Sequence, residues 1–255
     1  MKKTITVRGI TIGEGMPKIC VPLTGSTLSE LLEETECLRS LDFDVAEWRA
    51  DFFEHAEELE KVLAALKVLR SSLRDDIPLL FTFRSENEGG QKGISLENYV
   101  ELNKAIIESG QVELIDVELF CGDEIVKQLV AIAHAKNVFV IVSNHDFTKT
   151  PSKEEIISRL CKAQELGGDL PKIAVMPKDA ADVLTLLDAS NTMIEKFADR
   201  PIITMSMAQK GMISRLAGEV FGSVLTFGAA KKASAPGQIS ATVLRDILAL
   251  LHEKK

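Results

Sequence analysis

The feature that most constrains the fold is a regular alternation between short apolar runs and longer amphipathic segments. The apolar runs recur about every 30 residues along the 255-residue chain. They are rich in β-branched residues and leucine, which is typical of strands covered on both faces. We predict eight strands, at 18–22, 44–49, 78–83, 113–118, 137–143, 171–176, 201–206 and 223–227. Intervening segments such as 28–41, 56–73, 154–166 and 180–197 carry apolar residues at helical spacing.

Eight strand–helix units predict an α/β fold, a closed parallel (β/α)8 barrel of the TIM-barrel class. We expect residues 1–255 to form a single domain, because no linker or low-complexity segment interrupts the pattern. Residues 4–13 contain two short alternating runs and predict a β-hairpin that closes the barrel bottom. The competing architecture, an open doubly wound sheet, usually carries a GxGxxG turn, and this sequence has none.

Composition and charge narrow the possible partners. The formal net charge is −8 at pH 7 and the basic residues are scattered, which argues against nucleic-acid binding. No apolar run has the length of a membrane span and no signal peptide opens the chain, so we expect a cytoplasmic protein without a membrane partner. The four cysteines are widely separated and lack metal-site spacing, which is typical of reduced thiols. A small molecule is therefore the expected partner.

Polar residues gather at the predicted strand ends. In a barrel of this class the active site lies at the carboxyl ends of the strands and in the loops that follow them. The polar residues at or after those ends are Glu47, Arg49, Asp51, Arg84, Glu86, Glu88, Asp116, Glu118, Ser143, Asn144, His145, Asp146, Lys172, Ser206, Arg215, Lys231, Lys232, Ser234 and Gln238. Any single pair can be a structural ion pair or a solvated loop charge. Their number at one end of the barrel favours an active site.

Two of these residues suggest covalent and proton-transfer chemistry. Lys172 opens an apolar strand, where loss of hydration favours a neutral amine that can attack a ketone. The predicted boundary places Lys172 near the strand start, so its side chain has to reach up the barrel axis. The alternative is a lysine that extends to solvent at the barrel bottom, and Lys18 has nearly the same local sequence. His145 follows an apolar strand and suits general acid–base catalysis, with a buried structural histidine as the alternative.

The chain resembles type I 3-dehydroquinate dehydratase, a shikimate-pathway lyase, over essentially its whole length. The matching segments are EWRAD at 47–51, LLFTFRS at 79–85, EGG at 88–90, SNHDF at 143–147, PKIAVMP at 171–177, PIITMSM at 201–207, SRLAGEVFGS at 214–223 and KKASAPGQ at 231–238. The resemblance implies a barrel enzyme that dehydrates 3-dehydroquinate to 3-dehydroshikimate through a Schiff base, in aromatic amino acid biosynthesis. It also implies a homodimer that needs no metal and no organic cofactor.

The resemblance also assigns roles to individual residues. Lys172 corresponds to the Schiff-base lysine, which distinguishes it from Lys18. His145 corresponds to the proton-transfer residue and Glu88 to the acid beside it. Arg215 corresponds to the residue that binds the substrate carboxylate. The remaining expected substrate contacts are Glu47, Arg49, Arg84, Met205, Met207, Ser234 and Gln238, of which the last two belong to a loop that closes over the substrate.

Two other functions stay open at this point. A different Schiff-base barrel, such as an aldolase that cleaves a carbon–carbon bond, would use Lys172 in the same way. Testing 3-dehydroquinate against sugar phosphates separates these two enzymes. A barrel without catalytic activity could serve as a binding module, and an ultraviolet assay for a conjugated product would distinguish it from an enzyme.

Overall fold

Eight parallel strands form one sheet in a computed structural model of the chain, which describes residues 3–230 and 237–252. The sheet order is β10–β3–β4–β5–β6–β7–β8–β9, so strands that follow one another along the chain lie side by side. The strands are β3 (Lys18–Leu23), β4 (Val45–Arg49), β5 (Leu79–Thr82), β6 (Leu114–Glu118), β7 (Phe139–Asp146), β8 (Leu170–Val175), β9 (Ile203–Ser206) and β10 (Leu225–Phe227). Every pairing between neighbours in this order is parallel.

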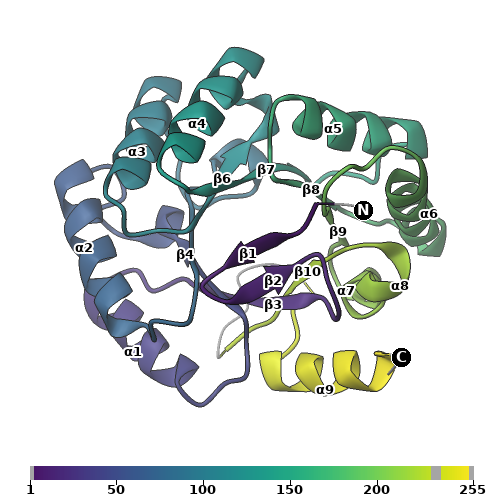
Figure 1. Ribbon diagram of the computed structural model, residues 1–255, viewed down its shortest axis with the longest axis horizontal. Coiled ribbons are helices and arrows are strands. Elements are labelled where there is room, and N and C mark those ends of the chain that lie inside the picture. Colours follow the sequence, from purple (N-terminus) through teal and green to yellow (C-terminus); the bar gives the residue numbers. More distant parts are fainter. Residues whose placement is uncertain (1–2, 231–236, 253–255) are drawn as a thin grey trace.

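The two edge strands of this sheet also meet, which closes the barrel. Ile202, just before β9, forms a parallel bridge with Ser223, just before β10. The backbone N–H of Val224 donates to the carbonyl of Ile202 at 3.0 Å. The predicted (β/α)8 barrel is confirmed, and Figure 1 shows its strands enclosed by helices. That residues 1–255 form a single domain stays a prediction.

Helices cover the outer face of the barrel (Figure 1). They are α1 (Leu28–Leu38), α2 (Leu59–Ser72), α3 (Leu96–Glu108), α4 (Asp123–Ala135), α5 (Lys153–Glu165), α6 (Ala180–Lys196), α7 (Met212–Leu216), α8 (Gly218–Phe221) and α9 (Ala241–Leu251). Thr27 caps α1 in a capping box with Glu30, and Ser152 caps α5. The helices predicted at 28–41 and 56–73 are shorter than expected, because the chain forms turns at 39–40 and 54–57.

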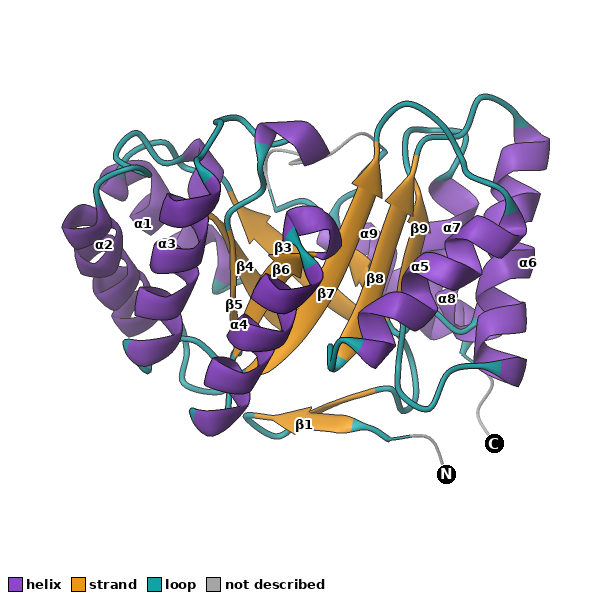
Figure 2. Cartoon of the chain, turned by 90° about the horizontal axis from the view of Figure 1, so that it is seen from above, coloured by secondary structure: helices purple, strands orange, loops and turns teal. Residues whose placement is uncertain are grey.

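The N-terminal hairpin closes one end of the barrel, as predicted. Strands β1 (Ile5–Val7) and β2 (Ile10–Ile12) pair antiparallel. Ile12 is fully buried and packs with Leu80 and Leu114 inside the barrel. Figure 2 shows the hairpin beneath the end from which the barrel strands start. The opposite end, where the strands finish, is therefore the one that can open to a substrate.

Side-chain alternation along the strands builds a polar layer on an apolar floor. Leu80, Leu114, Ile141 and Leu170 belong to the apolar cluster that contacts the hairpin. Two residues further along each strand the side chain points the same way. The residues at those positions are Thr82, Asp116, Ser143 and Lys172, and Glu47 holds the equivalent position two residues after Val45. All five polar side chains are buried.

All eight strands differ from their predicted ranges by one to three residues at one or both ends, and two of these differences affect the site. Strand β7 continues to Asp146, because its pairing with β8 extends to Asp146 opposite Val175. Residues 144–146, which were predicted to follow the strand, thus lie within it. Strand β8 starts at Leu170, so Lys172 is its third residue, paired with Ser143 on one side and Ile203 on the other. Lys172 therefore lies one residue further from the start of its strand than predicted, and its side chain has a shorter distance to reach along the barrel axis.

Candidate active site

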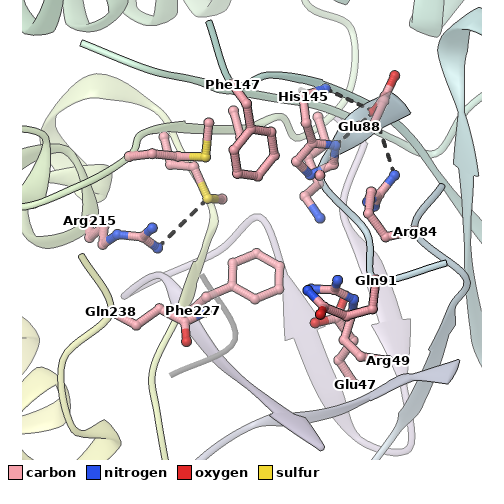
Figure 3. Close-up of a pocket in the computed structure, with 15 residues that line it drawn as sticks. Glu47, Arg49, Arg84, Glu88, Gln91, His145, Phe147, Arg215, Phe227 and Gln238 are labelled. Carbon is pink, nitrogen blue, oxygen red and sulfur yellow. Dashed lines mark hydrogen bonds and ion pairs between the residues drawn. The ribbon is translucent and has the colours of Figure 1, made fainter. Parts of the chain in front are cut away.

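A cavity of about 200 Å³ lies at the carboxyl ends of the strands. Figure 3 shows the side chains that line it pointing into a common space. They belong to Glu47, Arg49, Arg84, Glu88, Gly89, Gln91, His145, Phe147, Lys172, Ala174, Met205, Met207, Arg215, Phe227 and Gln238. Every predicted site residue that the structure describes is among them. The remaining one, Ser234, lies outside the described residues.

Lys172 brings a buried amine into this cavity. Its side chain is 4% exposed, and Nζ lies 3.4 Å from Oδ2 of Asp116. On another side, Nζ lies 4.6 Å from the centroid of the Phe227 ring, which is a cation–π contact. The amine therefore has a negative partner and an aromatic face, both of which stabilise positive charge on this nitrogen.

Asp116 is held as an anion by a buried network. Its Oδ1 accepts hydrogen bonds from Ser143 Oγ at 2.6 Å and from Arg84 Nη2 at 2.7 Å. Burial alone would raise the pKa of Asp116, but the charges of Arg84 and Lys172 outweigh it and lower the pKa below the usual value. Arg84 Nη1 also donates to Ser143 and to Glu118, each at 3.0 Å. The carboxylate beside Lys172 thus stays ionised and fixed in place.

His145 and Glu88 form a hydrogen-bonded pair at the edge of the cavity (Figure 3). Glu88 ends the short 3₁₀ helix η2 (Glu86–Glu88), and its Oε2 lies 2.9 Å from Nδ1 of His145. The backbone N–H of His145 donates to the same oxygen at 2.9 Å. This contact fixes the ring and leaves Nε2 as the nitrogen available to a substrate.

Burial sets the protonation of this pair. It raises the pKa of Glu88 to about 8, against the opposing charge of Arg84. Burial and the charges of Arg84 and Lys172 lower the pKa of His145 well below 6.5. Both shifts disfavour a separated carboxylate–imidazolium pair. The pair therefore carries no separated charges at neutral pH. Loss of the Glu88 proton leaves a neutral imidazole that can accept a proton through Nε2.

Arg215 supplies a cation on another wall of the cavity. It lies on α7, is 2% exposed, and Nη1 is 3.8 Å from Sδ of Met205. Burial lowers the pKa of Arg215 to about 10, so the guanidinium stays charged at neutral pH. Figure 3 shows Arg215 and Gln238 across the cavity from Arg84 and Glu88. A guanidinium in this position can bind a carboxylate through two parallel hydrogen bonds.

The remaining wall offers donors and acceptors that suit hydroxyl groups. Arg49 donates from Nε and Nη2 to the carboxylate of Asp51 at 2.8 and 2.7 Å, which fixes its guanidinium. Glu47 Oε1 accepts a hydrogen bond from Thr82 Oγ1 at 2.8 Å.

Gly89 allows the ring of Phe147 to pack closely against the backbone. A Cβ at this position would come within 2.3 Å of the ring, and the φ of +84° also favours glycine.

Within the described ranges, no group of three His, Cys, Asp or Glu side chains is placed to hold a metal ion. None of the helices in the described part of the chain is long and apolar enough to cross a membrane.

A family model for type I 3-dehydroquinase matches residues 19–255. The chain belongs to the type I 3-dehydroquinase family. The 3-dehydroquinate dehydratases of Bacillus licheniformis and Clostridioides difficile are 63% and 58% identical to it, and each alignment covers 99% of both proteins.

Solved structures of the family agree with this fold. A type I 3-dehydroquinate dehydratase from Clostridium difficile, crystallised with covalent modified comenic acid, superposes with a TM-score of 0.96. It is 59% identical, and the match covers 99% of each chain. The 3-dehydroquinate dehydratase of Enterococcus faecalis superposes with a TM-score of 0.92 at 41% identity, over 98% of this chain and all of the other.

The sequence assigns no role to several residues that lie in or beside this cavity. Asp116 was noted at a strand end, but only its contact with Lys172 suggests what it does. Strand alternation was the available signal, since Asp116 lies two residues after inward-facing Leu114. In the sequence, Phe227 is the last residue of the strand predicted at 223–227, with nothing to mark it as part of a site. Gln91 follows the turn at Gly89, whose path the sequence pattern does not predict.

Proposed function

We propose that this chain dehydrates 3-dehydroquinate to 3-dehydroshikimate through a Schiff base on Lys172, as a lyase of the shikimate pathway in aromatic amino acid biosynthesis. One observation carries the proposal: the buried amine of Lys172 shares a cavity with the His145–Glu88 pair and with Arg215. The names of relatives that are about 60% identical over nearly the whole chain support the same substrate.

The first step forms the covalent intermediate. In its neutral form, the Nζ of Lys172 adds to the C3 carbonyl of the substrate, and loss of one water leaves an imine. Protonation of that imine places a positive charge on the nitrogen, and in the structure Lys172 Nζ lies 3.4 Å from Oδ2 of Asp116. A fixed carboxylate at that distance stabilises the iminium and so makes the adjacent carbon acid stronger.

The second step moves protons. His145 removes the C2 proton, and the electron pair passes to the imine nitrogen to give an enamine. The enamine then expels the C1 hydroxyl, which takes a proton from His145 and leaves as water. Hydrolysis of the remaining iminium frees the product and restores the amine of Lys172. Each positioned proton transfer contributes about 10²–10⁴-fold to the rate.

The other predicted residues hold the substrate in this proposal. Arg215 binds the carboxylate, since a guanidinium matches its two oxygens. Glu47, Arg49 and Arg84 hold the ring hydroxyls. Met205 and Met207 pack against the ring, and Gln238 lies near the carboxylate side. Ser234, on the expected closing loop, is proposed from the family resemblance alone.

We also propose a homodimer in the cytoplasm. The support for a dimer is the family resemblance together with exposed apolar side chains, among them Leu184, Val220 and Leu250 at 65%, 68% and 83% exposure. Four free cysteines support a reducing compartment. Light scattering coupled to size exclusion tests the assembly, and a monomer at micromolar concentration would contradict it.

The direct test is an ultraviolet assay for the conjugated product. The wild type should convert 3-dehydroquinate, and Lys172→Ala should be inactive although folded. Lys178→Ala is the matched control, because Lys178 is exposed just after the same strand, and it should retain wild-type activity. Conversion of a sugar phosphate in place of 3-dehydroquinate would favour an aldolase. If neither substrate is converted, the remaining hypothesis is a barrel that binds a ligand without catalysing a reaction.

A further inference from the structure

The His145–Glu88 pair also faces a second cavity, of about 600 Å³. Glu88 and His145 line both cavities. Asn144 and Arg159 line the second cavity and are absent from the wall of the first. They therefore approach the catalytic pair from behind, out of contact with the space that the substrate occupies in the proposed function.

Arg159 fixes the orientation of the Asn144 amide. Arg159 Nη1 donates to Asn144 Oδ1 at 2.9 Å, and Asn144 Nδ2 donates to Glu88 Oε1 at 3.1 Å. A guanidinium has donors and no acceptor, so the amide oxygen must face it. With the amide turned over, the NH₂ group would face the guanidinium and the oxygen would face the carboxylate. Both of those contacts are repulsive.

Arg159 is itself held in place on α5. Its Nε donates to Glu155 Oε1 at 2.8 Å, one helical turn earlier. Its Nη1 lies 3.7 Å from Asp146 Oδ2, and its guanidinium lies 5.4 Å from the centroid of the Phe120 ring. The side chain is 16% exposed. The contact with Asn144 therefore belongs to a defined arrangement of the guanidinium.

We propose that Arg159 is a positioning residue that, through Asn144, keeps Glu88 an acceptor toward Nδ1 of His145. Glu88 Oε2 already accepts from the backbone N–H of His145. The hydrogen bond from Asn144 to the other oxygen stabilises the carboxylate relative to the carboxylic acid, against the burial that raises the pKa of Glu88 to about 8. Once ionised, Glu88 cannot donate to Nδ1, so the ring carries its hydrogen there and presents an unprotonated Nε2 to the cavity. This inference rests on the proposed dehydration.

Other charges face the same pair from several elements. Arg84 Nη1 lies 3.6 Å from Glu88 Oε2, and Lys172 and Arg49 add positive charge on the side of His145. Glu118 and Asp116, both on β6, add negative charge that raises the pKa of Glu88. The hydrogen bond from Asn144 lowers that pKa. If the Asn144 amide loses its orientation, this hydrogen bond is lost and the pKa of Glu88 rises further. Glu88 then needs a higher pH to ionise.

The test compares Arg159→Met with Glu155→Gln. The first removes the donor to Asn144; the second removes an ion-pair partner of Arg159 and leaves that donor in place. We expect Arg159→Met to lower kcat about tenfold, the size of one charge-assisted hydrogen bond, with KM within about twofold. The ascending limb of its pH–kcat profile should move to higher pH. Glu155→Gln should match the wild type in both readouts, and all proteins should give equal borohydride-trapped imine.

A double-mutant cycle then tests the coupling. If Arg159 acts through Asn144, the double variant Arg159→Met/Asn144→Leu should be no slower than Asn144→Leu alone. Losses that multiply would overturn the inference, as would an unchanged kcat and pH profile in Arg159→Met. If Asn144→Leu does not fold, the Arg159→Met result decides alone, because methionine keeps most of the length of this partly exposed side chain. Absence of 3-dehydroquinate turnover in the wild type would contradict the proposed function, which is a different result from an unchanged Arg159→Met variant.

Discussion

Replacing Asp116 by asparagine tests whether a fixed anion stabilises the covalent intermediate. The substitution keeps the size of the side chain and an acceptor for Ser143. It removes the negative charge 3.4 Å from Lys172 Nζ. In the proposed mechanism the imine must be protonated to draw electrons from C2. Without its counter-ion the protonated imine is disfavoured, and the step that follows it slows.

The distance sets the expected size of the effect. Two unit charges 3.4 Å apart attract by about 5 kcal/mol at an effective dielectric constant of about 20. Part of that attraction also acts in states that precede the protonated imine, and that part does not lower the barrier. We therefore expect roughly 2–3 kcal/mol to be lost from the transition state, which is a roughly 30- to 160-fold fall in kcat.

Glu118→Gln is the matched control for this variant. Glu118 lies two residues further along the same strand and pairs with Arg84 at 3.0 Å, as Asp116 does at 2.7 Å. Its loss removes a buried anion without removing the charge beside Lys172, so kcat should fall less than about tenfold. Stopped-flow ultraviolet assays and thermal melting measure both variants. A folded Asp116→Asn enzyme with kcat within about threefold of the wild type would refute the reasoning.

Three further predictions concern the other catalytic and binding groups. His145→Ala should still form the imine and then stall, so mass spectrometry should find a persistent substrate adduct; no adduct would contradict the division of roles between His145 and Lys172. The kcat/KM of the wild type should rise with pH through a midpoint of about 8, as the Glu88–His145 pair loses the proton that blocks Nε2. The Glu88→Gln variant has no ionisable group at this position, so its kcat/KM should not rise with pH near 8. If the rise persists in this variant, Glu88 is not its source. Arg215→Lys should raise KM about tenfold with a smaller effect on kcat, because an ammonium does not reproduce the paired hydrogen bonds of a guanidinium; an unchanged KM in steady-state kinetics would count against the carboxylate contact.

The periodic apolar pattern was sufficient to predict the barrel and its hairpin. Strands covered by helices have a strong local signature, and eight of them in succession leave few other ways to fold. Strand ends were less accurate, because a strand stops where its neighbours stop pairing. Strand β7 continues to Asp146 because β8 pairs with it that far, and no property of residues 143–146 alone indicates this.

The two similar lysines show the same limit within the site. Lys18 and Lys172 both follow proline and precede an isoleucine, yet β3 begins at Lys18 whereas β8 begins two residues before Lys172. Lys18 therefore lies at the rim of the barrel bottom, with Nζ 3.4 Å from the carbonyl of Glu14. The pairing register with neighbouring strands makes this difference. The resemblance to a known family predicts Lys172 as the Schiff-base lysine, whereas the local sequence alone does not separate it from Lys18.

The sequence pattern does not predict the contact between Arg159 and Asn144. The two residues are separated by a loop and a helix cap, and they meet because α5 packs against β7 and β8. Arg159 looks like one more charge on the polar face of a surface helix. Only the orientation of the amide between the helix and the catalytic pair distinguishes it from its neighbours.

The most direct test of the covalent mechanism is borohydride reduction in the presence of 3-dehydroquinate, followed by peptide mapping. A nitrogen bound to the substrate as an imine becomes a stable secondary amine under these conditions. We predict a single modified peptide with the added mass on Lys172 and no modification of Lys18. Full loss of activity without any adduct on Lys172, or an adduct on another lysine, would contradict the account.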